Sequence, residues 1–250
     1  METIMGLVKT VFHVHTDYSE DSNLSLYCLI KEARERGVGC VMVTDHDSIE
    51  GARQLAQMAG DDLQVVIGEE ISTQDGHLIG LFLRDFIEPG MSARRTAETI
   101  REQGGLVAVP HPYNRLFECS LGDKAYDILD LIDVVEIANA QNLSPWPNRR
   151  AREFARRNGL PAIVGTDVHH RGYLDSCYQM MHNFDGPAEF VASLQTARLH
   201  AKAHPLGYFF RSAYVIARYR LGLGVPSGYG ANATDIPATT HAQEAALSAK

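Results

Sequence analysis

Seven short apolar runs alternate with segments of helical pattern, and this alternation limits the folds available to the chain. The runs are rich in β-branched residues and are bounded by polar residues or glycine, as β-strands usually are. Helical crossovers between most of them favour a largely parallel sheet, which either winds doubly or closes into a barrel. The runs are GLVKTVFHVH, CVMVTDH, LQVVIGEEIS, GHLIGLFL, LVAVPHP, DVVEIAN and PAIVGTDVHH.

The remaining segments predict helices within one domain. Ser25 can cap the first helix, LSLYCLIKEARERG, and Gly37 ends it. A length of 250 residues suits one barrel, which we expect over residues 1–225 with its C-terminal helices. From Pro226 the composition turns to Gly, Ala, Thr, Ser and Pro, which predicts a disordered tail over residues 226–250. The later helices are expected near residues 49–60, 92–103, 123–131, 147–158, 187–199 and 206–221.

Charge and cysteine content restrict the partners and the compartment. The formal net charge of −8 argues against a stable nucleic-acid complex, although a short oligonucleotide remains compatible. No run is long and apolar enough for a signal peptide or a membrane span, so a cytoplasmic location is expected. The four cysteines are widely spaced, which favours reduced thiols with structural roles. The oligomeric state is left open.

Histidines and carboxylates gather at the ends of the predicted strands, which a parallel barrel brings to one face. One histidine at a strand end usually has a packing role, but six on successive strands favour a metal site. Imidazole with carboxylate suits zinc, manganese or iron. More than four such ligands exceed the need of one tetrahedral ion, which predicts two or three ions. The residues are His13, His15, His46, Glu69, Glu70, His77, His111, Glu136, Asp167 and His169.

The ordered motifs H-x-H-T-x-Y-S-x-D-S, T-D-H-D, G-E-E-I-S-T with G-H-L-I-G-L-F, H-P-Y-x-R and G-T-D-x-H resemble those of the PHP family, named for polymerase and histidinol phosphatase domains. The resemblance covers residues 11 to about 170 and implies an α/β fold, a distorted (β/α)7 TIM-like barrel, with metals at the strand C-termini. Adjacent side chains on a strand face opposite ways, so only one of Glu69 and Glu70 can be a ligand. The resemblance favours Glu70, because the family's ligand directly precedes the apolar residue and Ser. The implied ligands are His13, His15, Asp21, His46, Glu70, His77, His111, Asp167 and His169.

The resemblance also implies how these ligands divide. A first ion would be held by His13, His15, Glu70 and Asp167. Glu70 would bridge to a second ion held by His77 and His111, and a third would be held by Asp21, His46 and His169.

Three further residues are candidates for catalysis or substrate binding. Asp45 is a possible proton donor to the leaving group, a residue that orients His46 or its neighbours, or an ordinary turn aspartate. Arg115 and Arg171 follow ligand motifs closely, where a guanidinium can hold phosphate. His170 is not expected to be a ligand, because His169 takes the inward direction.

The expected activity is hydrolysis of a small phosphomonoester or nucleotide-type substrate by water that bridges two cations. One alternative is amidohydrolase-like hydrolysis of an amide or a non-phosphate ester. The other is a non-catalytic or proofreading-type module acting on nucleic-acid ends. The segment GYFFRSAYVIARYRLGLG could lie on a membrane surface, but a helix packed on the barrel with snorkelling arginines is favoured, and no membrane partner is expected.

Overall fold

The computed structural model describes residues 6–114 and 119–223, and its strands form one closed mixed barrel. The seven barrel strands follow the order β1-β2-β3-β4-β5-β6-β7, and β1 pairs with both β2 and β7 to close the ring. Most neighbours are parallel, but β4 is antiparallel to β3 and to β5. All seven predicted strands are present: β1 Leu7–Val14, β2 Cys40–Val43, β3 Gln64–Thr73, β4 Gly76–Leu81, β5 Leu106–Val109, β6 Val134–Asn139 and β7 Ala162–Val168.

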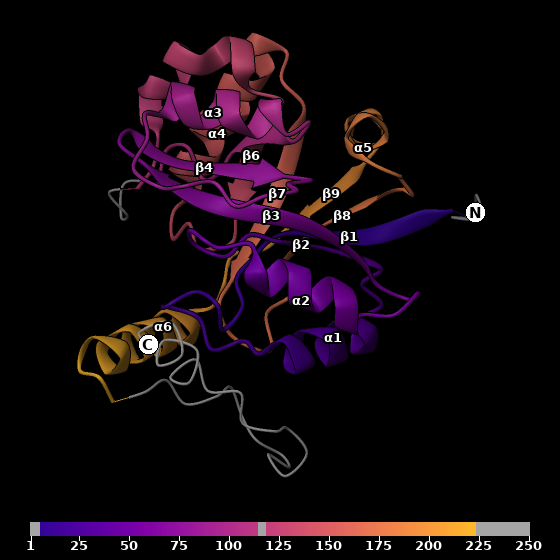
Figure 1. The fold of residues 1–250 in the computed structure, drawn as a ribbon, viewed down its shortest axis with the longest axis vertical. Coiled ribbons are helices and arrows are strands. Elements are labelled where there is room, and N and C mark those ends of the chain that lie inside the picture. The colour runs from indigo at the N-terminus through magenta and orange to yellow at the C-terminus, as the bar shows by residue number, and fades with distance from the viewer. Residues whose placement is uncertain (1–5, 115–118, 224–250) are drawn as a thin grey trace, which may run out of the picture.

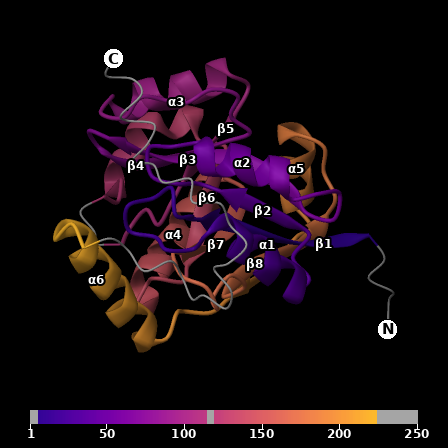
Figure 2. The same ribbon diagram turned by 60° about the horizontal axis from the view of Figure 1, so that its bottom comes forward.

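Helices cover the barrel on two sides (Figure 1). One side carries α1 and α2, and the opposite side carries α3 and α4 (Figures 1 and 2). Each layer has its own apolar core against the outer faces of the strands. A third cluster, which includes Phe12, Met42 and Ile79, combines inward residues of the strands with the β8–α5 segment. The helices are α1 Leu26–Glu35, α2 Glu50–Met58, α3 Ala93–Glu102, α4 Pro145–Asn158, α5 Pro187–Leu194 and α6 Leu206–Arg220.

Two strands were not predicted from the sequence. β8 (Cys177–His182) pairs antiparallel with β1, and β9 (Arg198–Ala201) pairs antiparallel with β8. The sequence of β8, CYQMMH, contains no β-branched residue and so lacks the usual strand signal. The helix expected to reach residue 199 ends at Leu194, because β9 is held by pairing with β8 instead.

Two other segments refine the prediction. Residues Gly122–Leu131 form a 3-10 helix, η1, with non-helical backbone at Ile128, rather than a regular α-helix. Helix α6 packs through its buried Tyr208 and Val215, while Leu206, Phe210 and Leu221 are exposed. Within the described parts of the chain, no helix combines the length and the apolar character needed to cross a membrane. The predicted tail, residues 226–250, lies outside the described residues.

Candidate metal centre

The barrel brings the nine predicted ligands to one end. Parallel strands contribute from their C-terminal ends, where His15, His111 and His169 directly follow or lie near the ends of β1, β5 and β7. Because β4 runs in the opposite direction, its start, which carries His77, lies at the same end. The structure therefore gathers the side chains that the family resemblance implied as ligands, including Asp21 from the loop after β1.

A register shift in β1 and positive φ angles at three residues set the directions of several of these side chains. The pairing of β1 with both neighbours shifts register around His13, which marks a β-bulge. His13, His111 and Asp167 have positive φ angles of 66°, 26° and 48°. Non-glycine residues rarely adopt this region, and such strain concentrates at functional sites. Three of the nine candidate ligands are thus held in unfavourable conformations by the surrounding barrel.

Glu70 lies at the centre of the cluster. Its Oε1 is 2.9 Å from His77 Nδ1 and 3.0 Å from His111 Nε2. Its Oε2 is 3.1 Å from His13 Nε2. Burial alone would raise the pKa of Glu70, but the surrounding imidazoles, His13 foremost, outweigh it and hold the pKa well below its usual range. Glu70 is therefore an anion with both oxygens directed at imidazole nitrogens.

A second part of the cluster surrounds Asp21. Its Oδ2 is 3.1 Å from His169 Nε2 and 3.5 Å from His46 Nε2. The ring of His15 lies between these groups, with its centroid 4.1 Å from that of His169 and 4.5 Å from that of His46. His15 also approaches Asp167, with its Nε2 atom 3.5 Å from Asp167 Oδ1.

The donor set fits divalent cations. Nε2 of His15 and Oδ1 of Asp21 are buried and make no hydrogen bond, although each is a good metal ligand. Burial, reinforced by repulsion from His169 and His46, lowers the pKa of His15 to about 3, so its ring is neutral and has a lone pair available. Several sets of three or four ligand atoms lie within 4.8 Å of one another, as one ion requires.

Ser19 and Asp45 determine which nitrogen of His15 faces the cluster. Asp45 is fully buried and accepts hydrogen bonds from Thr16 N at 2.6 Å, Thr16 Oγ1 at 2.7 Å and Ser19 Oγ at 2.8 Å. Having donated its proton, Ser19 Oγ accepts from His46 N at 3.0 Å and from His15 Nδ1 at 3.2 Å. This leaves the lone pair of His15 on Nε2, toward the cluster.

This geometry bears on the roles considered for Asp45. The carboxyl group does not line the cavity beside the cluster, and its oxygens are used by Thr16 and Ser19. Although burial raises its pKa to about 6, it has no access to a leaving group. The structure thus disfavours proton donation by Asp45 and supports the alternative in which it orients neighbouring ligands.

Glu136 supports His13 in the same manner. Its Oε1 accepts from His13 Nδ1 at 3.0 Å, which directs His13 Nε2 toward Glu70. Its Oε2 accepts from the backbone N–H of His111 and from Asn139 Nδ2. The sequence places Glu136 among the polar strand residues but gives no sign of this supporting contact. The contact arises because β7 pairs with both β6, which carries Glu136, and β1, which carries His13.

Other sequence candidates lie away from the cluster. Glu69 faces the opposite side of β3 and accepts from Ile87 N at 3.1 Å, and burial raises its pKa to about 8. His170 Nδ1 lies 2.8 Å from Asn23 Oδ1 and its Nε2 lies 2.9 Å from Ser212 Oγ. Arg171 is partly exposed and is not among the residues lining the cavity. Arg115 lies outside the described residues.

Cys119 is a feature that the sequence did not indicate. All four cysteines are free, as expected. Cys119 lines the cavity together with His77 and His111. The ligand atoms of these three residues lie within 4.8 Å of one another, and such a set could hold a metal ion. No metal-ligand spacing in the sequence connects Cys119 with His77 or His111.

A closed seven-stranded α/β barrel with histidines and carboxylates at one end defines a metal-binding TIM-like barrel. The family model for the PHP domain matches residues 12–151, and a model described as PHP-associated matches residues 145–199. The first match spans more than half of the chain, and the protein therefore belongs to the PHP domain family. The uncharacterized protein MJ1587 of Methanocaldococcus jannaschii is 40% identical over 144 residues, covering 53% of this chain and 82% of that protein.

Solved structures share the fold. A two-domain protein from Bacteroides vulgatus, containing a predicted PHP-like metal-dependent phosphoesterase, aligns with a TM-score of 0.63 at 17% identity. The alignment covers 78% of this chain and 65% of that protein, so this chain spans about two thirds of its length. An amidohydrolase from Chromobacterium violaceum aligns with a TM-score of 0.56 at 16% identity, covering 74% of this chain and 96% of that one. At these identities the likeness concerns the fold alone.

Proposed function

We propose that this protein is a metal-dependent hydrolase that cleaves a small phosphomonoester or nucleotide-type substrate. The observation that carries the proposal is the convergence of nine histidines and carboxylates at one end of the barrel, beside a cavity of about 350 Å³. That volume is near the lower end of the range for small-molecule sites, which favours a small substrate. The family assignment supports phosphoester chemistry.

We assign the ligands to three sets around Glu70. The first ion would be held by His13, His15, Glu70 and Asp167, the second by Glu70, His77 and His111, and the third by Asp21, His46 and His169. The contacts of Glu70 with imidazoles on both of its oxygens support its bridging position. Two or three zinc, manganese or iron ions would polarise the phosphate and lower the pKa of water.

The other residues of the site position these donors. Ser19 and Asp45 fix the orientation of His15, and Glu136 fixes that of His13. Hydrogen bonds of this kind keep ligand nitrogens directed at the ions and raise their basicity. Arg115 is proposed to hold a phosphate oxygen with its planar guanidinium group. Arg171 is a weaker candidate, since it does not line the cavity.

A substrate screen on protein of known metal content tests the proposal. The chelated protein is reloaded with zinc, manganese or iron(II), and its metal content is measured by elemental analysis. Phosphate release from an aryl phosphate, a nucleoside monophosphate and a 5′-phosphorylated oligonucleotide is then compared with cleavage of an aryl ester and an anilide. We expect two or three ions per chain and turnover of the monoesters. One ion or fewer, or turnover only of the ester or anilide, would contradict the proposal.

A further inference from the structure

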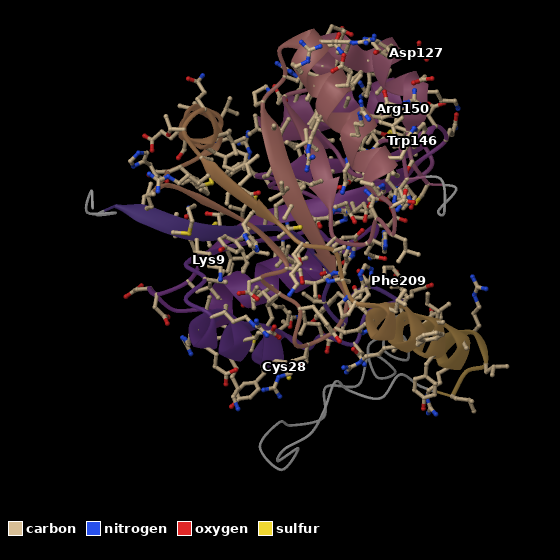
Figure 3. All side chains as sticks on the ribbon, turned by 180° about the vertical axis from the view of Figure 1, so that it is seen from behind. Lys9, Cys28, Asp127, Trp146, Arg150 and Phe209 are labelled. Atoms are coloured by element: carbon tan, nitrogen blue, oxygen red, sulfur yellow. The ribbon has the colours of Figure 1, made fainter. Side chains whose placement is uncertain are left out.

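Helix α6 forms one wall of the cavity beside the metal centre. Phe209, Ser212, Ala213 and Ile216 line the same cavity as Glu70, His77, His111 and Asp167. Phe209 lies where α6 meets the barrel (Figure 3). The helix begins at Leu206, after the residues matched by either family model, which end at 199. This wall is therefore additional to the part of the chain that defines the family.

Contacts at the C-terminal end of β7 fix α6 in place. The hydroxyl group of the fully buried Tyr208 donates to the carbonyl of Asp167 at 3.0 Å and accepts from the N–H of His169 at 2.9 Å. The ring of His204 stacks on that of Tyr208 with a centroid distance of 3.9 Å. Ser212 Oγ lies 2.9 Å from His170 Nε2. The wall is thus tied to the C-terminal end of β7, where the candidate ligands Asp167 and His169 lie.

The chemistry of the wall differs from that of the opposite side of the cavity. Phe209, Ala213 and Ile216 offer a ring, a methyl group and a branched alkyl chain, and Ser212 is already engaged by His170. Among the described residues lining the cavity, none is lysine or arginine. Among the described residues of this cavity, a second anionic group on the substrate would meet no lysine or arginine, whereas an apolar group against Phe209, Ala213 and Ile216 would lose its contact with water.

We infer that α6 selects phosphomonoesters whose organic group is uncharged and apolar, such as an aromatic or branched aliphatic alcohol. This inference rests on the proposed function, because it places the phosphate at the metal centre and the organic group against Phe209, Ala213 and Ile216. The cavity volume of about 350 Å³ suits a single ring. Phe209 and Ile216 are accordingly specificity-determining residues.

Neighbouring phenylalanines provide a matched control. Phe209 lines the cavity, whereas Phe210 is 77% exposed and does not. Phosphate release from benzyl phosphate and from 2-hydroxyethyl phosphate is compared, because both leaving groups are primary alcohols and differ mainly in polarity. We expect the wild-type protein to prefer benzyl phosphate. Phe209→Ala and Ile216→Ala should each reduce that preference by at least about tenfold, as loss of apolar contacts in a pocket does. Phe210→Ala should leave it unchanged.

A filling substitution and a binding measurement complete the test. Ala213→Phe should occupy the cavity and selectively impair benzyl phosphate, and thermal melting of each variant checks that it is folded. Binding of benzylphosphonate and 2-hydroxyethylphosphonate to the metal-loaded protein is measured by calorimetry, because neither compound requires turnover. Preferential binding of benzylphosphonate that Phe209→Ala removes would support the subsite even if the protein hydrolysed no monoester. Equal binding of both phosphonates, or equal effects of Phe209→Ala and Phe210→Ala, would overturn the inference.

Discussion

The carboxylate of Glu136 lies 3.0 Å from Nδ1 of His13, and this contact turns the other ring nitrogen toward Glu70. The space for it depends on Gly165, since a Cβ atom there would lie 1.5 Å from Glu136 Oε1. The G-T-D motif therefore supplies a candidate ligand, Asp167, and also leaves room for the carboxylate that orients another. A supporting group of this kind fixes the orientation of a ligand ring and raises its basicity.

We predict that Glu136→Gln weakens metal binding by about 10- to 100-fold, the usual cost of losing such a supporting contact. The carboxylate accepts hydrogen bonds from His13, His111 and Asn139, and an amide has only one oxygen with which to replace it. Competition with a chelator measures the affinity. Glu153→Gln, at an exposed ion pair on α4, is the control and should bind metal normally. Unchanged affinity in Glu136→Gln would contradict the supporting role.

The two adjacent glutamates of β3 should respond differently to the same substitution. Glu70→Gln should abolish hydrolysis, because an amide cannot present two anionic oxygens to the surrounding ligands and ions. Glu69→Gln should retain most of the rate, because the pKa of Glu69 is raised to about 8 by burial and the side chain is already mainly neutral at pH 7. Steady-state rates at equal metal content make the comparison. Similar losses in both variants would show that Glu69 also contributes to the site.

Cys119 is predicted to bind metal together with His77 and His111. Protein reconstituted with cobalt(II) should show near-ultraviolet thiolate-to-cobalt charge transfer, which Cys119→Ser should remove. Cys28→Ser, at a partly exposed position on α1, should retain it. A thiolate is softer than carboxylate or imidazole, so Cys119→Ser should also reduce the preference for zinc over manganese. A cobalt spectrum without charge transfer in the wild-type protein would exclude coordination by sulfur.

The barrel strands were predictable because their signals are local, and the nine clustered side chains because they stand in short ordered motifs that resemble those of one family. Apolar β-branched runs identify the strands, and most of them have ligand-type residues at or just after one end, such as His77, His111 or Asp167. β8 was missed because it is held by pairing with β1 and β9 rather than by its own propensity. The loop before η1 likewise gave no sign that Cys119 would lie beside His77.

Supporting contacts were harder to predict than the ligand cluster, because they join residues that are distant in sequence. Glu136 lies 123 positions from His13, and Ser19 meets Asp45 across 26 positions. The position of α6 beside the metal centre depends on the hydrogen bonds of Tyr208 with the end of β7. The sequence of that helix mixes apolar residues with arginines, which suits a helix on a membrane surface as well as a helix packed on the barrel. The tertiary contacts of Tyr208 show the packing on the barrel.

His204 should make stability depend on pH where it anchors α6. Burial lowers its pKa to about 4 and outweighs the hydrogen bond that Nε2 donates to the carbonyl of Thr166 at 2.8 Å, while the buried Nδ1 has no hydrogen-bond partner for a second proton. Below the ordinary histidine pKa of about 6.5, the unfolded chain therefore takes up a proton that the folded protein does not, and stability falls as the pH decreases toward 4. This residue should contribute a loss of about 1.5 kcal/mol between pH 6.5 and pH 5, because the slope is half of 1.36 kcal/mol per pH unit at pH 6.5 and approaches the full value near pH 5. His204→Phe removes the hydrogen bond at every pH but should flatten this slope in denaturant titrations of the chelated protein. His200→Phe, at an exposed position on β9, should keep the wild-type slope. If His204→Phe shows the same pH dependence as the wild-type protein, the acid sensitivity arises elsewhere.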